Sequence, residues 1–197
     1  MTQGLERLLP AGGVAFAAVL AAAAIIRDAD SDAYLLGLAG FFLIAFLGAL
    51  RAALREVEGD TAPLSATAVI GGSVAAVGYV LLAAAYARVA GPTSEDLAEV
   101  APFAFFVSFP QAAVVGAAGT VMATTGIVSS RLGLAGQVLV PLQLAAPLVL
   151  LSNSDDYAVG LAVGPFAVWV AVAGVLLLRK PGPLDGQPDT TNGAGRR

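Results

Sequence analysis

Six long runs without a single charged residue dominate this sequence. They span residues 8–26, 33–50, 64–87, 100–125, 134–151 and 158–178, and the 10 basic and 14 acidic residues all lie outside them. A helix of about 20 residues crosses roughly 30 Å of hydrocarbon. One ionisable group at the centre of such a helix costs about 2.5–3.5 kcal/mol on insertion scales. The pattern therefore predicts an all-α polytopic membrane protein, a bundle of six transmembrane helices.

The composition agrees with this class and excludes several others. Of the 197 residues, 58% are apolar and 12% are charged, whereas soluble domains are about one quarter charged. The chain contains no cysteine and no histidine, which excludes disulfides, thiolate metal sites, histidine-ligated haem and histidine general bases. The net charge of −4 argues against nucleic acid. We expect the lipid bilayer as the main partner, and no cofactor.

The arginines and lysines predict the orientation. Eight of them fall at the N-terminus, in the second-to-third and fourth-to-fifth connections, or in the tail: Arg7, Arg51, Arg55, Arg131, Arg179, Lys180, Arg196 and Arg197. The opposite loops hold only Arg27 and Arg88. Because basic residues are retained in the cytoplasm, both termini are expected on the cytoplasmic side of the cell membrane. Residues 181–197 have no apolar periodicity and are predicted to be a disordered cytoplasmic tail.

The first run has two interpretations. It is N-terminal and rich in alanine, so it could be a cleaved signal peptide. However, Glu6 and Arg7 leave its flank without net positive charge, and nineteen apolar residues are long for a signal core. A retained transmembrane helix is the preferred interpretation, and cleavage stays open.

The second run passes directly into an amphipathic extension that ends near residue 58. Its apolar positions recur at spacings of three and four residues, and its charged positions fall on another face: Leu47, Leu50, Leu54 and Val57 against Arg51, Arg55 and Glu58. This spacing predicts one continuous helix. We expect the extension to lie at the cytoplasmic boundary, where arginines meet anionic headgroups.

The first outer loop resembles the beginning of a calcium loop. Residues 28–32 alternate aspartate with other residues, but Ala33 stands where such a loop needs glycine, and Ala39 where it needs glutamate. We predict no metal site from this motif. A weak divalent site shared among several acidic outer loops stays open.

Prolines and glutamines stand together in the fourth and fifth runs. Gln111 follows Pro110, and Gln143 lies between Pro141 and Pro147. Each proline leaves the carbonyl four residues earlier without its helical donor, and hydrocarbon offers no water to replace it. A short turn joins the two runs, so they are antiparallel and the two amides share a similar depth. We predict that both amides face the bundle interior and hydrogen-bond to each other or to the carbonyls that proline leaves unpaired.

Two further features belong to this candidate intramembrane polar centre. Ser108, Ala112, Gly116, Thr120 and Thr124 follow one another at four-residue spacing, which is typical of a face that a neighbouring helix approaches closely. Trp169 lies too deep in the sixth run for the interfacial belt, so its indole N–H needs a partner within the bundle. The candidate site residues are Gln111, Gln143, Ser108, Thr120, Thr124 and Trp169, and none is assigned a catalytic role.

One passage carries a family resemblance. Residues 46–55, Glu58-Gly59, Leu64-Ser65 and Gly71-Gly72 resemble the uncharacterised DUF4386-type family of bacterial, mostly actinobacterial, multi-helix membrane proteins. The resemblance implies an integral membrane protein without an established activity, and it assigns no functional residue.

Two functions fit these patterns. The first is a small structural or accessory membrane component, either a homo-oligomer or a subunit that joins a membrane partner. The alternative is a transporter or channel-like protein for a small neutral or apolar solute, using the proline and glutamine centre. An enzyme is not indicated, because the sequence has no phosphate loop, nucleophile elbow or intramembrane carboxylate pair. A polar cavity lined by the site residues would favour transport, and a dry core with bonded polar groups would favour the structural role.

Overall fold

The protein is an all-helical bundle in a computed structural model that describes residues 8–26, 29–59, 61–88, 94–152 and 156–179. Within these ranges only the backbone is described for residues 29–30, 94–105, 149–152 and 156–162. The six helices of the described chain are α2 (Ala11–Ile26), α3 (Ala29–Glu58), α4 (Pro63–Tyr86), α5 (Ser94–Thr125), α6 (Ser130–Ser152) and α7 (Asp156–Arg179). The described ranges contain no strand. The predicted disordered tail, residues 181–197, lies outside them, and so do Asp28 and Asp155 of the acidic outer loops.

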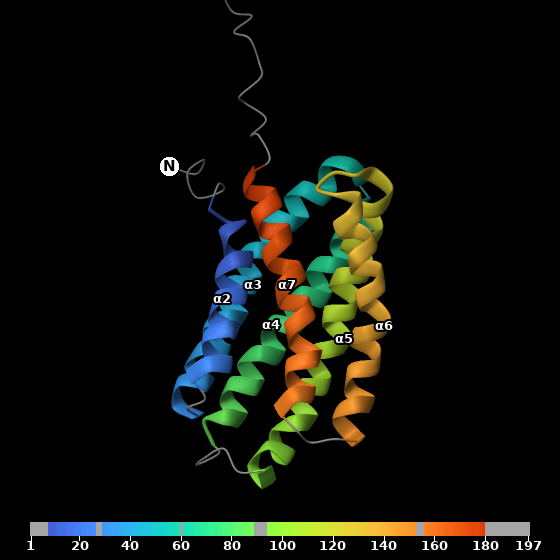
Figure 1. Ribbon diagram of the computed structural model, residues 1–197. Coiled ribbons are helices and arrows are strands. Elements are labelled where there is room, and N and C mark those ends of the chain that lie inside the picture. Colours follow the sequence, from blue (N-terminus) through green and yellow to red (C-terminus); the bar gives the residue numbers. More distant parts are fainter. Residues whose placement is uncertain (1–7, 27–28, 60, 89–93, 153–155, 180–197) are drawn as a thin grey trace, which may run out of the picture.

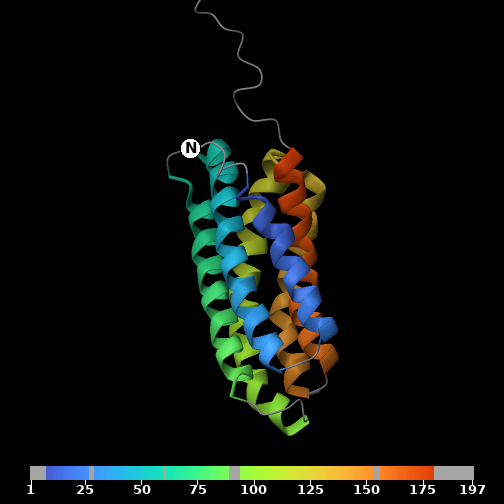
Figure 2. The same ribbon diagram turned by 90° about the vertical axis from the view of Figure 1, so that its left-hand side faces the viewer.

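The helices close into a ring of antiparallel neighbours. Each helix packs chiefly on the helices before and after it in the chain, and α7 returns to pack on α2. Figures 1 and 2 show an elongated bundle in which α2 begins at the same end as α7 finishes. This order follows from short connections, because a short connection between helices makes them antiparallel neighbours.

Three helical segments are long and apolar enough to cross a membrane. They are Ser31–Glu58, Pro63–Tyr86 and Phe106–Thr125. The segments Ala11–Ile26 and Val163–Arg179 are apolar but shorter. Helix α6, which contains Gln137, Gln143 and two prolines, is not among these candidates. The prediction of an all-α membrane protein therefore has the support of three described segments.

The amphipathic extension is the last part of a continuous α3. Leu47, Leu50 and Leu54 are buried, while Arg51 and Arg55 are exposed. The extension therefore continues the helix axis and buries the three leucines of its apolar face against protein, whereas Val57, the last residue of that face, is 39% exposed.

Glu58, the last residue of α3, joins this helix to the start of α4. Its Oε1 accepts a hydrogen bond from the Leu64 backbone N–H at 3.0 Å, and its Oε2 accepts one from Ser65 at 2.7 Å. The first N–H groups of a helix have no partner within the helix and carry partial positive charge. The carboxylate therefore caps α4 and holds the α3–α4 connection.

Aromatic rings tie α2, α4 and α7 together in the core. The rings of Phe16 and Tyr79 meet edge to face with centroids 5.4 Å apart, and those of Phe16 and Phe166 with centroids 5.9 Å apart. All three side chains are fully buried. Edge-to-face pairs add about 0.5–1.5 kcal/mol beyond the area that they bury. Helix α2 is thus an integral part of the packed bundle.

Helix α4 has its large apolar side chains outside and its small residues inside. The outward face carries Ile70, Val74, Val77, Val80 and Leu81, each at least half exposed. The buried face is formed largely by small residues: Ser65, Ala68, Gly71, Gly72, Ala75, Ala76 and Gly78. A helix on the surface of a water-soluble protein has a polar outward face, so this arrangement is that of a helix whose surroundings are apolar.

Candidate intramembrane polar centre

Gln111 and Tyr79 form a buried hydrogen-bonded pair in the centre of the bundle. The Gln111 Nε2 on α5 donates to the Tyr79 hydroxyl oxygen on α4 at 2.7 Å. Both side chains have no exposed surface. A buried polar group that loses its only partner costs about 1–3 kcal/mol, so each member of the pair requires the other.

Tyr79 is a site residue that the sequence analysis missed. It lies seven residues after Gly72 and three after Ala76, and these three residues occupy one buried face of α4. A tyrosine on a face of small residues, deep within an apolar run, was the signal that could have identified it.

Gln143 lies in the same interior but its amide is not bonded. The side chain is 1% exposed, and neither Nε2 nor Oε1 has a hydrogen-bond partner among the described residues. The Oε1 of Gln111 is likewise unbonded there. The hydrogen bond predicted between the two amides does not form, and Gln143 makes none to a carbonyl that proline leaves unpaired; the Gln111 amide nitrogen bonds to Tyr79.

A different glutamine joins α5 to α6. The Gln137 Nε2 donates to the Thr120 Oγ1 at 2.8 Å and to the Gly116 carbonyl oxygen at 2.9 Å. Thr120 in turn donates its hydroxyl to the Gly116 carbonyl at 2.8 Å. We call these three residues the α5–α6 clamp. Gln137 was not among the predicted site residues; its own carbonyl is the one that Pro141 leaves without a helical donor.

The four-residue stripe on α5 does not stay on one face, and the prediction that it does was wrong. Ser108 and Ala112 are buried, whereas Thr120 and Thr124 are exposed. Each step of four residues advances the helix by about 40° beyond a full turn, so four steps rotate the stripe by about 160°. Thr124 bonds to the Thr120 carbonyl of its own helix at 2.9 Å. Thr120 and Thr124 are thus separate from the buried pair of Gln111 and Tyr79.

Glycines allow the close crossing of α5 and α6. A Cβ atom on Gly133 would collide with the backbone nitrogen of Ala123, and one on Gly119 would come 2.9 Å from the Gly133 carbonyl oxygen. Both contacts are with backbone, which cannot move aside as a side chain can. This crossing has the features expected of helix packing in lipid, where small residues let backbones approach.

Trp169 bonds within the bundle, in agreement with its depth in the run. Its Nε1–H donates to the Leu132 carbonyl oxygen on α6 at 3.0 Å, and the side chain is 2% exposed. Gly136 makes room for the indole, since a Cβ atom there would lie 3.1 Å from Nε1. The tryptophan therefore joins α7 to α6.

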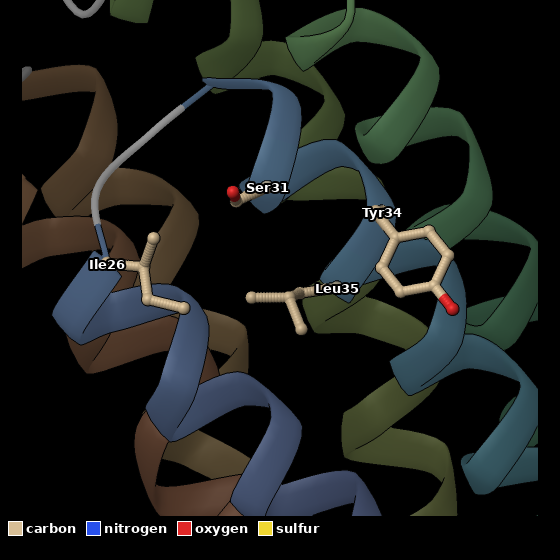
Figure 3. A pocket seen from close by; sticks show the side chains of 4 residues that line it. All are labelled: Ile26, Ser31, Tyr34 and Leu35. Atoms are coloured by element: carbon tan, nitrogen blue, oxygen red, sulfur yellow. The ribbon is translucent and has the colours of Figure 1, made fainter.

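An open hollow lies between the adjacent ends of α2 and α3. Ile26, Ser31, Tyr34 and Leu35 line it. Figure 3 shows the Leu35 side chain between the two helices and the Tyr34 hydroxyl turned away from Ile26. Tyr34 is 71% exposed, which suits an aromatic residue at a membrane boundary. The lining of the hollow is mostly apolar, with hydroxyl groups from Ser31 and Tyr34.

The described residues contain no group of three or more acidic side chains that could hold a metal ion. Comparison of the chain with protein-family models, with curated proteins and with solved structures found no match. The proposal that follows rests on the geometry of the bundle.

Proposed function

We propose that this chain is an integral protein of the cell membrane with six spans and cytoplasmic termini, and that it acts as a small structural or accessory component. The observation that carries the proposal is the reversed polarity of α4. Its exposed side chains Ile70, Val74, Val77, Val80 and Leu81 face outward, and most of its glycines and several of its alanines face the core. In lipid the outward face has a favourable environment, and the small residues permit close packing.

The arrangement of the bundle supports six spans. Helices α2 and α7 are packed against each other, with Phe16 and Phe166 in contact, although each apolar segment is short by itself. Helix α6 is bonded to α5 through Gln137 and to α7 through Leu132. A helix so joined to its neighbours has to share their environment. The packing of α2 also supports its retention as a helix of the mature protein.

The distribution of charge supports cytoplasmic termini. Arg51 and Arg55 at the end of α3, Arg131 at the start of α6 and Arg179 at the end of α7 are exposed. These helix ends lie at one end of the bundle, whereas Arg88 follows α4 at the other (Figure 1). The end with more arginines is the one expected in the cytoplasm.

The accessory role is supported by how the buried polar groups are used. Gln111 and Trp169 each bond to a neighbouring helix. These bonds hold the bundle together and leave the Gln111 and Trp169 donors engaged. We also propose, from the resemblance described above, a relation to the uncharacterised DUF4386-type membrane proteins.

The chain is well suited to a direct test of topology because it contains no cysteine. Single variants Thr61→Cys, Ser130→Cys and Ala87→Cys place one thiol at exposed positions in or next to three connections. We expect an impermeant maleimide to label Ala87→Cys in intact cells, and the other two only after the membrane is opened. Labelling of Thr61→Cys in intact cells, or release of the protein by alkaline carbonate, would contradict the proposal.

Passage of a small neutral solute is the second candidate, and the unbonded amide of Gln143 favours it. A solute that crosses a bundle has to find hydrogen-bonding groups that are not already engaged. Reconstituted vesicles should then take up a neutral solute such as urea or glycerol faster than empty vesicles do, and Gln143→Leu should remove the difference. Equal uptake with and without protein would eliminate this candidate.

A further inference from the structure

Three buried amide atoms are left without a partner in the described residues. They are the Oε1 of Gln111 and both polar atoms of Gln143. Their residues are 0% and 1% exposed. Native proteins leave very few buried polar side-chain atoms unpaired, and each exception requires an explanation.

The helix register places these amides at one level of the bundle. Gln137 on α6 bonds to Gly116 and Thr120 on α5. The two helices are antiparallel, so moving six residues along α6 to Gln143 corresponds to moving the same distance back along α5, to residues 110–114. Gln111 falls in this interval, with Tyr79 bonded to it.

The polar groups at this depth in the bundle are uncharged, and they include both hydrogen-bond donors and acceptors. Gln143 supplies an N–H₂ donor and a carbonyl acceptor, and Gln111 supplies a second acceptor. The Tyr79 hydroxyl accepts from Gln111 and keeps its own hydrogen to donate. Pro147 has no N–H for the Gln143 main-chain carbonyl, which adds an acceptor. None of the fully buried side chains of the described chain is charged, so nothing at this site would balance an ion.

We propose that Gln111, Gln143 and Tyr79 form a binding site for a small neutral molecule that both donates and accepts hydrogen bonds, and that water occupies it. Water has two hydrogens for the two amide oxygens and lone pairs for the Gln143 N–H₂ group. Internal waters commonly make about three such bonds to buried polar groups. The site goes beyond the structural role proposed above and does not require transport. It places a water-mediated link between α5 and α6, about one and a half turns along each helix from Gly116 and Gln137 of the α5–α6 clamp.

Solid-state NMR of the full chain in lipid bilayers tests this site in the unsubstituted protein, with two variants used only to assign signals. Side-chain ¹⁵N labelling of glutamine marks five residues, Gln3, Gln111, Gln137, Gln143 and Gln187, and the variants Gln137→Met and Gln143→Met assign two of the signals. We expect magnetisation to pass from water protons to the Gln143 amide. In a second sample, ¹⁵N-labelled on the threonine backbone, the amide of Thr61, an exposed residue, is the positive control. Absence of transfer to Gln143, at mixing times that reach Thr61, would overturn the proposal.

Thermal unfolding of Gln143→Met gives a second readout. The melting temperature should change in opposite directions if the Gln143 amide binds water and if it is buried without a ligand. Methionine has nearly the shape of glutamine but makes no comparable hydrogen bonds. If water satisfies the amide, the substitution removes bonds, and the melting temperature falls by about 2–4 °C. If the amide is buried without a ligand, the substitution removes an unpaired polar group and the melting temperature rises, which overturns the proposal. Gln137→Met shows the fall expected when a bonded glutamine is lost. Neither readout depends on the cysteine-labelling assay, so the proposal of a water site and the proposed membrane topology can be contradicted independently of each other.

Discussion

The side-chain nitrogen of Gln111 on α5 donates a 2.7 Å hydrogen bond to the hydroxyl of Tyr79 on α4, with both residues fully buried. The same tyrosine ring packs edge to face on Phe16 of α2. One residue therefore connects three helices, by a polar contact on one side and an apolar contact on the other.

Removing the Tyr79 hydroxyl should destabilise the bundle. Tyr79→Phe keeps the ring and its contact with Phe16 but leaves the Gln111 amide without its partner, at a cost of about 1–3 kcal/mol. Thermal unfolding followed by circular dichroism measures the effect. Tyr34→Phe is the matched control, since that side chain is 71% exposed. Equal melting temperatures for the two variants would show that the buried bond adds no stability.

The α5–α6 clamp should contribute less than this buried pair. Gln137→Leu removes both bonds to α5, while Thr120 keeps its bond to the Gly116 carbonyl. Hydrogen bonds between membrane helices average about 0.6 kcal/mol and reach about 1.7 kcal/mol, so we expect a loss in that range. Val138→Leu, at the neighbouring exposed position, should leave the free energy of unfolding unchanged. A loss for Val138→Leu as large as that for Gln137→Leu would mean that the clamp is not its cause.

Gly136 should be intolerant of a methyl group because of the tryptophan. In Gly136→Ala the new Cβ would lie 2.9 Å from the Val115 carbonyl oxygen and 3.1 Å from the Trp169 Nε1. We expect α5 and α6 to separate slightly and the indole to shift. Because the chain contains a single tryptophan, its fluorescence emission reports this directly. Gly164→Ala is the control, since nothing lies within 4 Å of its Cβ position. An unchanged spectrum in Gly136→Ala would contradict the described crossing.

Neutralising Glu58 should loosen the α3–α4 connection. In Glu58→Gln, one oxygen still caps α4, but an amide N–H₂ group faces the other N–H and the negative charge is lost. We expect a decrease of about 1 kcal/mol in the free energy of unfolding, measured by denaturation in detergent. Thr67→Val alters the first turns of α4 without touching the cap and should have a smaller effect. If both variants unfold alike, the carboxylate does not stabilise this end of α4.

The positions of the helices could be predicted from the sequence because they depend on local composition. Charged residues bound the apolar runs, and each predicted run falls on one helix. The continuous helix through Leu50, Leu54 and Glu58 follows from the same periodicity. These features require no knowledge of which helices become neighbours.

The partners of the polar residues could not be predicted, since they depend on tertiary packing. The bond between Gln111 and Tyr79 joins residues 32 positions apart on helices whose relative rotation is set by the whole bundle. The prediction that the stripe from Ser108 to Thr124 forms one face was wrong because residues spaced strictly by four move gradually around the helix. Trp169 was easier to interpret, since its depth alone required a partner within the bundle, and Leu132 supplies it.

The central claim is that the outward apolar faces of the bundle contact lipid, and spin labels on single cysteines test it most directly. Val77 and Val138 are 59% and 71% exposed and lie on different helices. In reconstituted vesicles, labels at Val77→Cys and Val138→Cys should collide often with oxygen, which dissolves in lipid, and rarely with a water-soluble nickel chelate. A label at Thr61→Cys should show the reverse. Nickel collision rates at Val77→Cys and Val138→Cys that equal the rate at Thr61→Cys would contradict the account.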